Sequence, residues 1–330
     1  MEMSEAVVDA DVIKDAVELA CRAPSLHNSQ PWRWMAEGGG VLHLFADPSR
    51  IGHHTDSTGR EVIISCGAVL DHLRVAMAAA GWEAIIDRYP NPNDRDHLAS
   101  IEFREMAFVS DVQRALAEAI RRRRTDRLPF AAPTRWESFE TVLRTVVDKS
   151  VADLDVIDDD GRPALADASR LTEQVRQHDS SYEAELLWWT GYSFSEEGIP
   201  PSALVSETEA QRVDVARSFP TSGQKSDRRA DVDRDHSKIV VLATYDDSRG
   251  NALGCGEVLS MVLLECTKAE LATCTLTHMI EVNASREFVR RLTGRTAEPQ
   301  VLIRVGQAPK TDPPPPPTPR RALTDVLEIR

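Results

Sequence analysis

Hydrophobic and polar positions along the chain predict a short series of elements that occurs twice. Residues 11–21 carry apolar side chains at helical spacing, and residues 41–50, VLHLFADPSR, have the pattern of an apolar strand that ends in a polar turn. Residues 239–249, IVVLATYDDSR, repeat the apolar run and end in a similar turn. The same strand-and-turn pattern therefore stands in both halves of the chain.

Each of these strands is followed by a long helix that is apolar on nearly every face. CGAVLDHLRVAMAAAG begins at Cys66, and CGEVLSMVLLECTKAE begins at Cys255, 189 residues later. A helix without a polar face is packed on several sides, as is a central helix in a layered α+β domain. The repeated order predicts an α+β fold of two duplicated and fused halves, against the alternative that two core helices share their composition by coincidence.

The two halves differ in the segment before the second strand. Residues 201–238 are long and highly charged and have no counterpart in the first half. We expect them to be too polar for the core. Two interpretations stay open: a solvated surface loop, or a lid over a site, since long loops in compact domains are often functional.

Composition narrows the class of protein. A chain of 330 residues with 42% hydrophobic residues can fill a substantial core, and a formal net charge of -14 argues against nucleic acid or an anionic membrane as a partner. Five scattered cysteines without C-x-x-C spacing predict neither a disulfide framework nor a zinc site. The N-terminus is acidic, and no run of about 18 apolar residues occurs. We therefore expect a cytoplasmic protein without a membrane span.

A turn after the first helix is the first candidate binding segment. Residues 22–34, RAPSLHNSQPWRW, combine a proline with small polar residues, which favours a turn whose side chains and amides are free to bind a ligand. The plainer interpretation is a helix-ending turn, with Trp32 and Trp34 buried on the following strand.

Two basic segments stand out in this acidic protein. Residues 121–130, RRRRTDRLPF, offer guanidinium forks and the hydroxyl of Thr125, which are the donors that a phosphate dianion needs. A solvated helix end is the alternative, although Pro129 and Phe130 indicate that the chain then enters the core. A polyproline spacer precedes Arg320 and Arg321, and the apolar residues after them indicate that the tail docks on the protein.

The sequence gives little support for other kinds of catalytic site. His278, in LATCTLTHMIE, is expected to be a hydrogen-bonded interior histidine rather than a base. The sequence contains no glycine-rich dinucleotide motif, P-loop, zincin motif or nucleophile elbow, which disfavours those enzyme classes.

Taken together, these segments resemble the nitroreductase family, and more closely its mycobacterial Acg-type branch. Residues 23–32, APSLHNSQPW, are similar to the family loop A-P-S-x-x-N-x-Q-P-W, and residues 123–127, RRTDR, resemble its R-R-S-x-R phosphate clamp. Residues 319–323, PRRAL, resemble its basic C-terminal segment, and residues 275–277 stand where the family places a strand end against a flavin. The resemblance covers essentially the whole chain, and the ten-residue loop is its most specific part.

The resemblance implies a three-layer nitroreductase-like fold and one FMN. It also implies ping-pong electron transfer from NADH or NADPH to a nitroaromatic or a quinone, without a catalytic side chain. The implied FMN-binding residues are Ser25, His27, Asn28, Gln30, Arg123, Arg124, Thr125, Arg127, Thr275, Leu276, Thr277, Arg320 and Arg321.

Each of these motifs occurs once, so the resemblance implies one complete site and one lost site. The site is shared between a half at 1–118, which supplies the loop, and a half at 119–330, which supplies the clamp and the arm 313–330. Such an internal pseudo-dimer needs no second chain to complete its site. The branch is associated with hypoxia and dormancy, which implies a role in stress.

Two alternatives stay open at this point. A flavin-sequestering or storage protein would hold FMN under a lid with little turnover. An α+β protein without flavin would carry its arginines on the surface.

Overall fold

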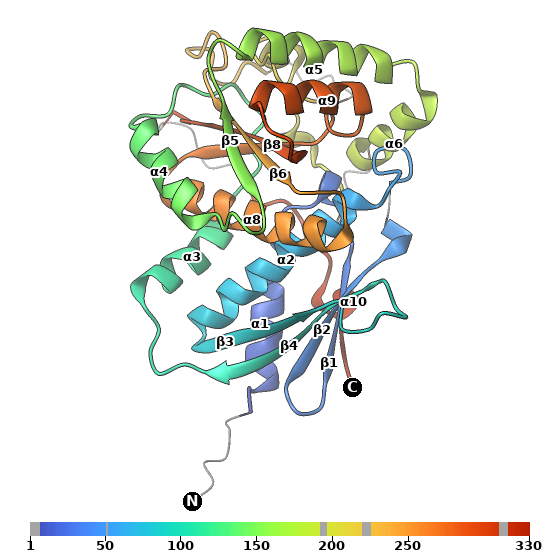
Figure 1. The fold of residues 1–330 in the computed structure, drawn as a ribbon, viewed down its shortest axis with the longest axis vertical. Helices are drawn as coiled ribbons and strands as arrows, with labels where there is room; N and C mark the ends of the chain where they lie inside the picture. The colour runs from blue at the N-terminus through green and yellow to red at the C-terminus, as the bar shows by residue number, and fades with distance from the viewer. Residues whose placement is uncertain (1–6, 51, 192–196, 220–225, 310–315) are drawn as a thin grey trace, which may run out of the picture.

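The computed structural model describes residues 7–50, 52–191, 197–219, 226–309 and 316–330. Two β-sheets lie on either side of two long helices, and α5 and α9 cover the outer side of the second sheet (Figure 1). The α-helices are α1 (Ala10–Ala20), α2 (Arg60–Ala79), α3 (Asp111–Arg122), α4 (Trp136–Val146), α5 (Arg162–Arg176), α6 (Ser180–Gly191), α7 (Glu207–Ala210), α8 (Arg249–Lys268), α9 (Asn283–Thr293) and α10 (Leu323–Val326). The strands are β1 (Trp32–Glu37), β2 (Val41–Ala46), β3 (Trp82–Arg88), β4 (His97–Glu105), β5 (Asp153–Ile157), β6 (Lys238–Thr244), β7 (Ala272–Leu276), β8 (Glu298–Gly306) and β9 (Leu327–Ile329).

The two sheets have the same strand order. One sheet runs β3-β4-β2-β1 and the other β7-β8-β6-β5, with antiparallel pairing throughout these eight strands. In each set of four strands, the first and third therefore stand at the two ends of the order, and the second and fourth stand between them. The first sheet also gains β9, which pairs in parallel with β1. The predicted mixture of helices and strands is confirmed, and the two sheets share one strand order.

The long helices α2 and α8 pack against each other at matching positions. Both span 20 residues, and they begin 189 residues apart, which is also the separation of Cys66 and Cys255. A Cβ on Gly67 would lie 2.0 Å from the carbonyl oxygen of Leu253, and a Cβ on Gly256 would lie 2.0 Å from that of Ile64. The contact is therefore nearly the same seen from either helix, and only glycine fits at its centre.

We expect the substitution Gly67→Ala to destabilise the protein by about 1–3 kcal/mol, because backbone atoms of α8 leave no room for the methyl group. The matched control is Gly250→Ala on α8, where a Cβ would meet nothing within 4 Å. That change should be neutral or stabilising by up to about 1 kcal/mol. Denaturant unfolding of both variants measures the difference, and equal stability of the two would contradict the close packing.

Helix α2 is long and apolar enough to cross a membrane by length and composition, but 83% of the tested stretch is buried inside the protein. Burial of this kind is typical of the core helix of a folded domain.

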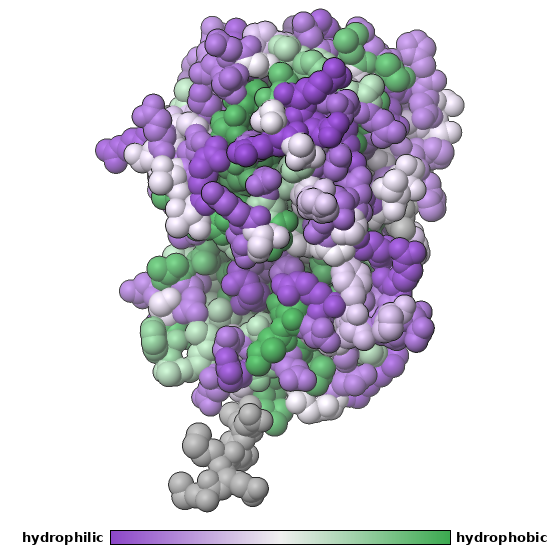
Figure 2. All heavy atoms as spheres, viewed as in Figure 1, coloured by the Kyte–Doolittle hydropathy of each residue, from purple (hydrophilic) through white to green (hydrophobic). Residues whose placement is uncertain are grey.

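On the face drawn in Figure 2, hydrophilic residues cover most of the surface, and hydrophobic residues appear between them in separate groups.

Two expected bounds differ from the structure: the boundary between the halves at 118, and the start of the extra segment at 201. Helix α3 spans residue 118, so the expected boundary at 118 falls inside a helix. The extra segment of the second half begins directly after β5 and includes α5, α6 and α7, whereas β1 and β2 are joined by a short turn at 38–40. Residues 201–238 are thus only the second part of a larger insertion.

The expectation that residues 201–238 are too polar for the core is wrong in part. Arg217, Arg229 and Asp235 are buried, because each has a partner of opposite charge. Arg229 pairs with Asp126 at 2.6 Å, and Asp235 pairs with Arg304 at 2.6 Å. Composition alone cannot reveal such partners, since they lie far away in the sequence. Residues 220–225 lie outside the described residues.

The C-terminal arm docks as predicted. Val326 is buried, and β9 extends the first sheet beside β1. The arm therefore carries Arg320 and Arg321 from the second half of the chain to the first. Residues 313–315 of the expected arm lie outside the described residues.

Candidate functional site

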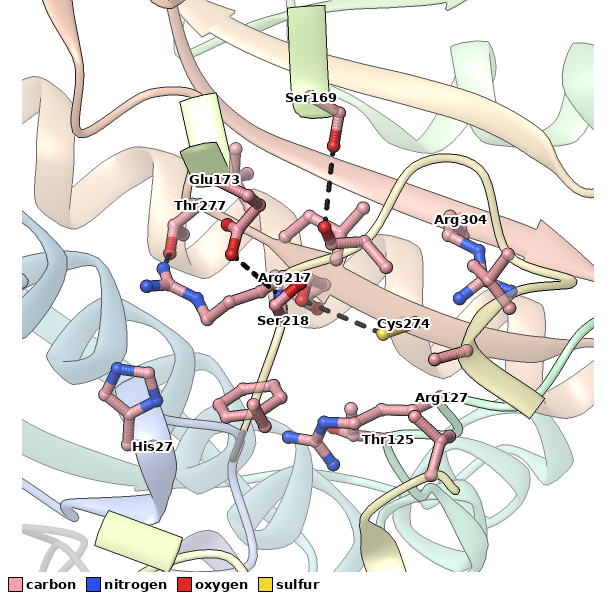
Figure 3. Close-up of a pocket in the computed structure, with 18 of the residues that line it drawn as sticks. His27, Thr125, Arg127, Ser169, Glu173, Arg217, Ser218, Cys274, Thr277 and Arg304 are labelled. Atoms are coloured by element: carbon pink, nitrogen blue, oxygen red, sulfur yellow. Dashed lines mark hydrogen bonds between the residues drawn. The ribbon is translucent and has the colours of Figure 1, made fainter. Parts of the chain in front are cut away.

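A cavity of about 920 Å³ lies where the two halves meet. We call it the inner cavity. Residues 24–27 and the start of α2 line it from the first half, and residues 274–277 at the end of β7 line it from the second (Figure 3). Thr125 and Arg127 lie along one side, and α5 and part of residues 205–219 complete the wall. The predicted turn, clamp and strand end are thus brought together.

The turn after α1 has an unusual backbone. His27, Asn28 and Gln30 have φ angles of 50°, 60° and 50°, a region that non-glycine residues seldom adopt. Side-chain hydroxyls hold this shape: Ser25 Oγ accepts a hydrogen bond from the Gln30 N–H at 3.0 Å, and Ser65 Oγ accepts one from the Leu26 N–H at 3.2 Å. Strained backbone that the surroundings hold in place is common at binding sites. Trp32 and Trp34 are also buried on β1, so the plainer expectation for this segment holds as well.

His27 lies on the wall of the inner cavity between two aromatic rings. Its ring stacks on Trp189 with centroids 6.4 Å apart, and it meets Phe219 edge-on at 5.9 Å. Burial, together with the nearby Arg217 and Arg127, holds the pKa of His27 well below its usual value. Its Nε2 is buried without a hydrogen-bond partner among the described residues. The neutral ring can therefore form a hydrogen bond with a ligand.

A small pocket rich in arginine adjoins the inner cavity and shares Pro24, Ser25, Thr125 and Arg127 with it. We call it the basic pocket. Asn28 and Gly198 also line it, and so do four further arginines: Arg22, Arg123, Arg124 and Arg320. Asn28 Nδ2 donates to the carbonyls of Gly198 and Pro319, which fixes the far side of the pocket.

The arginines of the basic pocket repel one another. Burial, and then the charges of Arg124 and Arg22, lower the pKa of Arg123 to about 10, and burial with Arg123 and Arg22 lowers that of Arg320 to about 9. Among the residues that the structure describes, no ion pair joins Arg123, Arg124 or Arg320 to a carboxylate. A pocket that makes positive charge this costly favours binding of an anion.

The arginines differ in the donors that they have left. Arg320 uses all five N–H groups on backbone carbonyls, among them those of Cys21 and Arg22 at the end of α1, so it supplies charge and holds the turn. The Nε atoms of Arg123 and Arg124 are buried without a hydrogen-bond partner within the described ranges. Arg127 donates one hydrogen bond, from Nη1 to the carbonyl oxygen of Ala203 at 3.3 Å. These three arginines keep donors for an anion.

The end of β7 brings backbone and hydroxyl groups to the inner cavity. Thr277 Oγ1 accepts a hydrogen bond from Arg217 Nη2 at 3.0 Å and donates one to Glu281 Oε1 at 2.9 Å. Arg217 also forms a close ion pair with Glu281, and its guanidinium lies beside Thr277 in Figure 3. Burial raises the pKa of the Cys274 thiol, which keeps this cavity-lining group neutral.

Two predicted residues line neither pocket. Gln30 is fully buried, and its Oε1 accepts a hydrogen bond from the Arg321 N–H at 2.9 Å. Arg321 in turn donates to the carbonyls of Gln30 and Asp325. The structure therefore assigns both residues to docking of the C-terminal arm against the turn. His278 is an interior histidine, as expected, and its Nε2 lies 2.8 Å from Ser169 Oγ.

Several cavity residues were not predicted from the sequence. They include Glu61, Glu173, Arg217 and Phe219 on the cavity wall, and Trp189 stacks on His27. Glu61 lies in the first turn of α2, a helix that is apolar on nearly every face, and a buried acidic residue there is a signal that could have found it. The others belong to the insertion, where polar residues such as Ser169 and Glu173 occupy buried positions, so a search for apolar residues does not find them.

The chain matches known proteins over nearly its full length, although no profile of a known protein family matches it. A protein of Mycobacterium tuberculosis strain H37Rv, named "Putative NAD(P)H nitroreductase acg", is 56% identical over 328 residues, which are 99% of this chain and 98% of the relative. Another protein of the same strain, also named as an NAD(P)H nitroreductase of this kind, is 37% identical over 97% of this chain and 92% of the relative.

Solved structures of nitroreductases are similar at a lower level. The FMN-dependent nitroreductase NfnB from Mycobacterium smegmatis, in complex with NADPH, has a TM-score of 0.41 and 14% identity, covering 66% of this chain and 98% of that one. A nitroreductase with bound FMN from Desulfitobacterium hafniense has a TM-score of 0.39 and 11% identity, covering 61% of this chain and 92% of that one. By its identity to the full-length mycobacterial relatives, the chain belongs to the nitroreductase family, in the branch that includes Acg.

Proposed function

We propose that the protein is an FMN-dependent oxidoreductase that passes electrons from NADH or NADPH to a nitroaromatic compound or a quinone. The observation that carries this proposal is the basic pocket, where buried arginines keep free donors at one end of a cavity of about 920 Å³. A cavity of this size accommodates a small-molecule cofactor. The names of the relatives support the same activity.

The residues present fit FMN. Arg123, Arg124 and Arg127, together with the hydroxyl of Thr125, are suited to hold its phosphate, and Arg320 adds positive charge. In the inner cavity, His27 and the backbone of residues 275–277 are suited to hydrogen-bond the ring. Bound FMN would supply the electron-carrying centre, while the protein provides binding, orientation and electrostatics.

The test is to load the protein with FMN without oxygen, add NADPH or NADH, and follow the absorbance of the oxidised flavin. We expect the absorbance to disappear and to return when a quinone is added, because the cavity would hold donor and acceptor in turn. Free FMN under the same conditions is the control. A protein that does not retain FMN contradicts the proposal.

A different outcome would favour flavin sequestration. FMN that stays bound, is reduced by dithionite and is not reduced by either nicotinamide would show a covered flavin with little turnover. Residues 205–219 of the insertion form part of the cavity wall, so they are the segment that would cover the ring.

Three further proposals follow. The common strand order and the 189-residue separation of α2 and α8 support an origin of the two halves by duplication and fusion. Because both halves of one chain line the inner cavity, a monomer would hold one complete site. Five buried free cysteines fit a reducing compartment, and we place the protein in the cytoplasm.

A further inference from the structure

A second cavity, of about 970 Å³, lies beside the inner one. We call it the outer cavity. Exposed side chains such as His53, His54 and Ser57 line it, so water reaches it. Among the described residues, Glu61 alone lines both cavities. Its side chain therefore stands in the wall between the solvent side and the proposed FMN site.

Glu61 has the surroundings of a neutral carboxylic acid. It is 3% exposed, and its Oε2 has no hydrogen-bond partner among the described residues. Its Oε1 lies 3.4 Å from Arg60 Nη2, at the limit of hydrogen-bonding distance. An ionised carboxylate with an oxygen buried in this way would pay a large desolvation cost.

The charges around Glu61 act in opposite directions, and those that raise its pKa are the larger. They come from Asp56 before α2, Arg60 on α2, Glu281 after β7 and Arg217 in the insertion. Arg60 and Arg217 lower the pKa of Glu61, but Arg217 is also the close partner of Glu281. Burial, and then Glu281 and Asp56, raise the pKa of Glu61 well above its usual value.

We propose that Glu61 transfers protons from the outer cavity to the substrate that is reduced in the inner cavity. This inference rests on the proposed function. Reduction of the substrate consumes one proton that the nicotinamide does not supply, and Glu61 would be the donor of that proton.

The proton balance defines the step. Reduction of a nitro group to a nitroso group takes the two electrons and one proton of the NAD(P)H hydride and one further proton from solvent, and it releases NAD(P)⁺ and water. The O–H bond of Glu61 breaks as an O–H bond forms on the departing oxygen, and the Glu61 carboxylate then takes a proton from water in the outer cavity. A quinone needs the same further proton to become a hydroquinone.

Glu173 provides a matched control. It is also a buried carboxyl on the inner cavity, has an unpartnered Oε1, and has a pKa raised by burial. Glu173 does not line the outer cavity, however, and its Oε2 accepts a hydrogen bond from the Ser218 N–H at 2.9 Å. A role that depends on the link between the cavities belongs to Glu61 and not to Glu173.

The experiment uses protein loaded with FMN, reduced with dithionite and mixed with benzoquinone in H₂O and in D₂O at several pH values. For the native protein, we expect a solvent isotope effect and a rate that falls as pH rises through the pKa of Glu61, because only the neutral acid can give a proton. Glu61→Gln should slow this step about 100-fold and abolish both effects. Glu61→Asp should restore part of the rate, and Glu173→Gln should keep the native pH profile.

A second readout needs no flavin. Infrared spectra of the unloaded protein at neutral pH should contain a band of a protonated carboxylic acid that Glu61→Gln removes. Unchanged rates, isotope effects and pH profile in Glu61→Gln would overturn the inference, as would equal losses in Glu173→Gln. If the native protein does not bind FMN, the proposed function fails, and a missing infrared band would separately refute the neutral Glu61.

Discussion

Replacing Asp235 by asparagine is expected to destabilise the protein by about 3–5 kcal/mol, because it leaves the buried Arg304 without its ion-pair partner. Asp235 and Arg304 are both 0% exposed and pair at 2.6 Å, and Arg162 approaches the other carboxylate oxygen at 2.7 Å. The same carboxylate accepts a hydrogen bond from the Phe130 N–H at 2.8 Å. Asp235 thus ties the end of the insertion to its first helix, α5, and also to β8 and the segment after the clamp.

The effect of Asp235 should depend on pH. Burial alone would raise its pKa, but the attraction of Arg304 and its hydrogen bonds lower it to about 2. The unfolded chain binds the proton at about 3.9, so the stability from this charge is present above that pH and is lost as pH falls through about 2. The native protein should lose this part of its stability in acid, and Asp235→Asn should lack that loss.

The matched control is Asp167→Asn. Asp167 pairs with Arg170 on the surface of α5, and both side chains are 65% exposed. Its loss should change stability by no more than about 0.5 kcal/mol, since water screens such pairs. Denaturant unfolding from neutral to acidic pH compares the variants, and an Asp235→Asn protein as stable as Asp167→Asn at neutral pH would show that the buried ion pairs matter little.

The double substitution Arg124→Ala and Arg127→Ala is expected to weaken FMN binding by about 10²–10⁴-fold. The reason is that each charge-assisted hydrogen bond to phosphate contributes about 1.5–3 kcal/mol. Both arginines line the basic pocket and keep N–H groups that no described residue accepts. Binding of riboflavin, which has the same ring without the phosphate, should change little. Fluorescence quenching of the two flavins measures the affinities.

Arg121 and Arg122 are the controls for this prediction. They belong to the same run of arginines but lie on the exposed end of α3, where Arg121 is 58% exposed and pairs with Glu118. Replacing both by alanine removes the same charge from the chain, yet it should leave FMN affinity within about threefold of the native value. Equal losses in the two double variants would mean that overall charge, and not the basic pocket, binds the phosphate.

The sequence predicts those parts of the fold that depend on the local pattern of hydrophobic and polar residues. The apolar helices from Cys66 and Cys255 have no polar face, and this alone indicates central positions between other layers. The insertion was not predictable in the same way. Arg217, Arg229 and Asp235 have the composition of a surface loop, and their burial depends on partners at 281, 126 and 304. Long-range pairing of charges leaves no periodic signal in a single sequence.

The site was predictable as a set of segments but not residue by residue. The run RRRRTDR indicates a basic cluster, yet it does not tell which arginines face inward, since Arg122 ends a helix on the surface and Arg123 is buried. Gln30 and Arg321 belong to motifs of the site, and the structure uses both to dock the arm. Glu61 was not predicted from the sequence, because the cavities that it lines form only in the folded protein. The loop before α2 lines the outer cavity, and the end of β7 lines the inner one.

The central claim is that one cavity, built from both halves of the chain, binds one FMN with its phosphate among the arginines. Titration of the unloaded native protein with FMN and, in parallel, with riboflavin tests it most directly. The account predicts one FMN per chain and an affinity for FMN at least about 100-fold above that for riboflavin, in proportion to two charge-assisted contacts. Equal affinity for the two flavins, or two FMN molecules per chain, would contradict it.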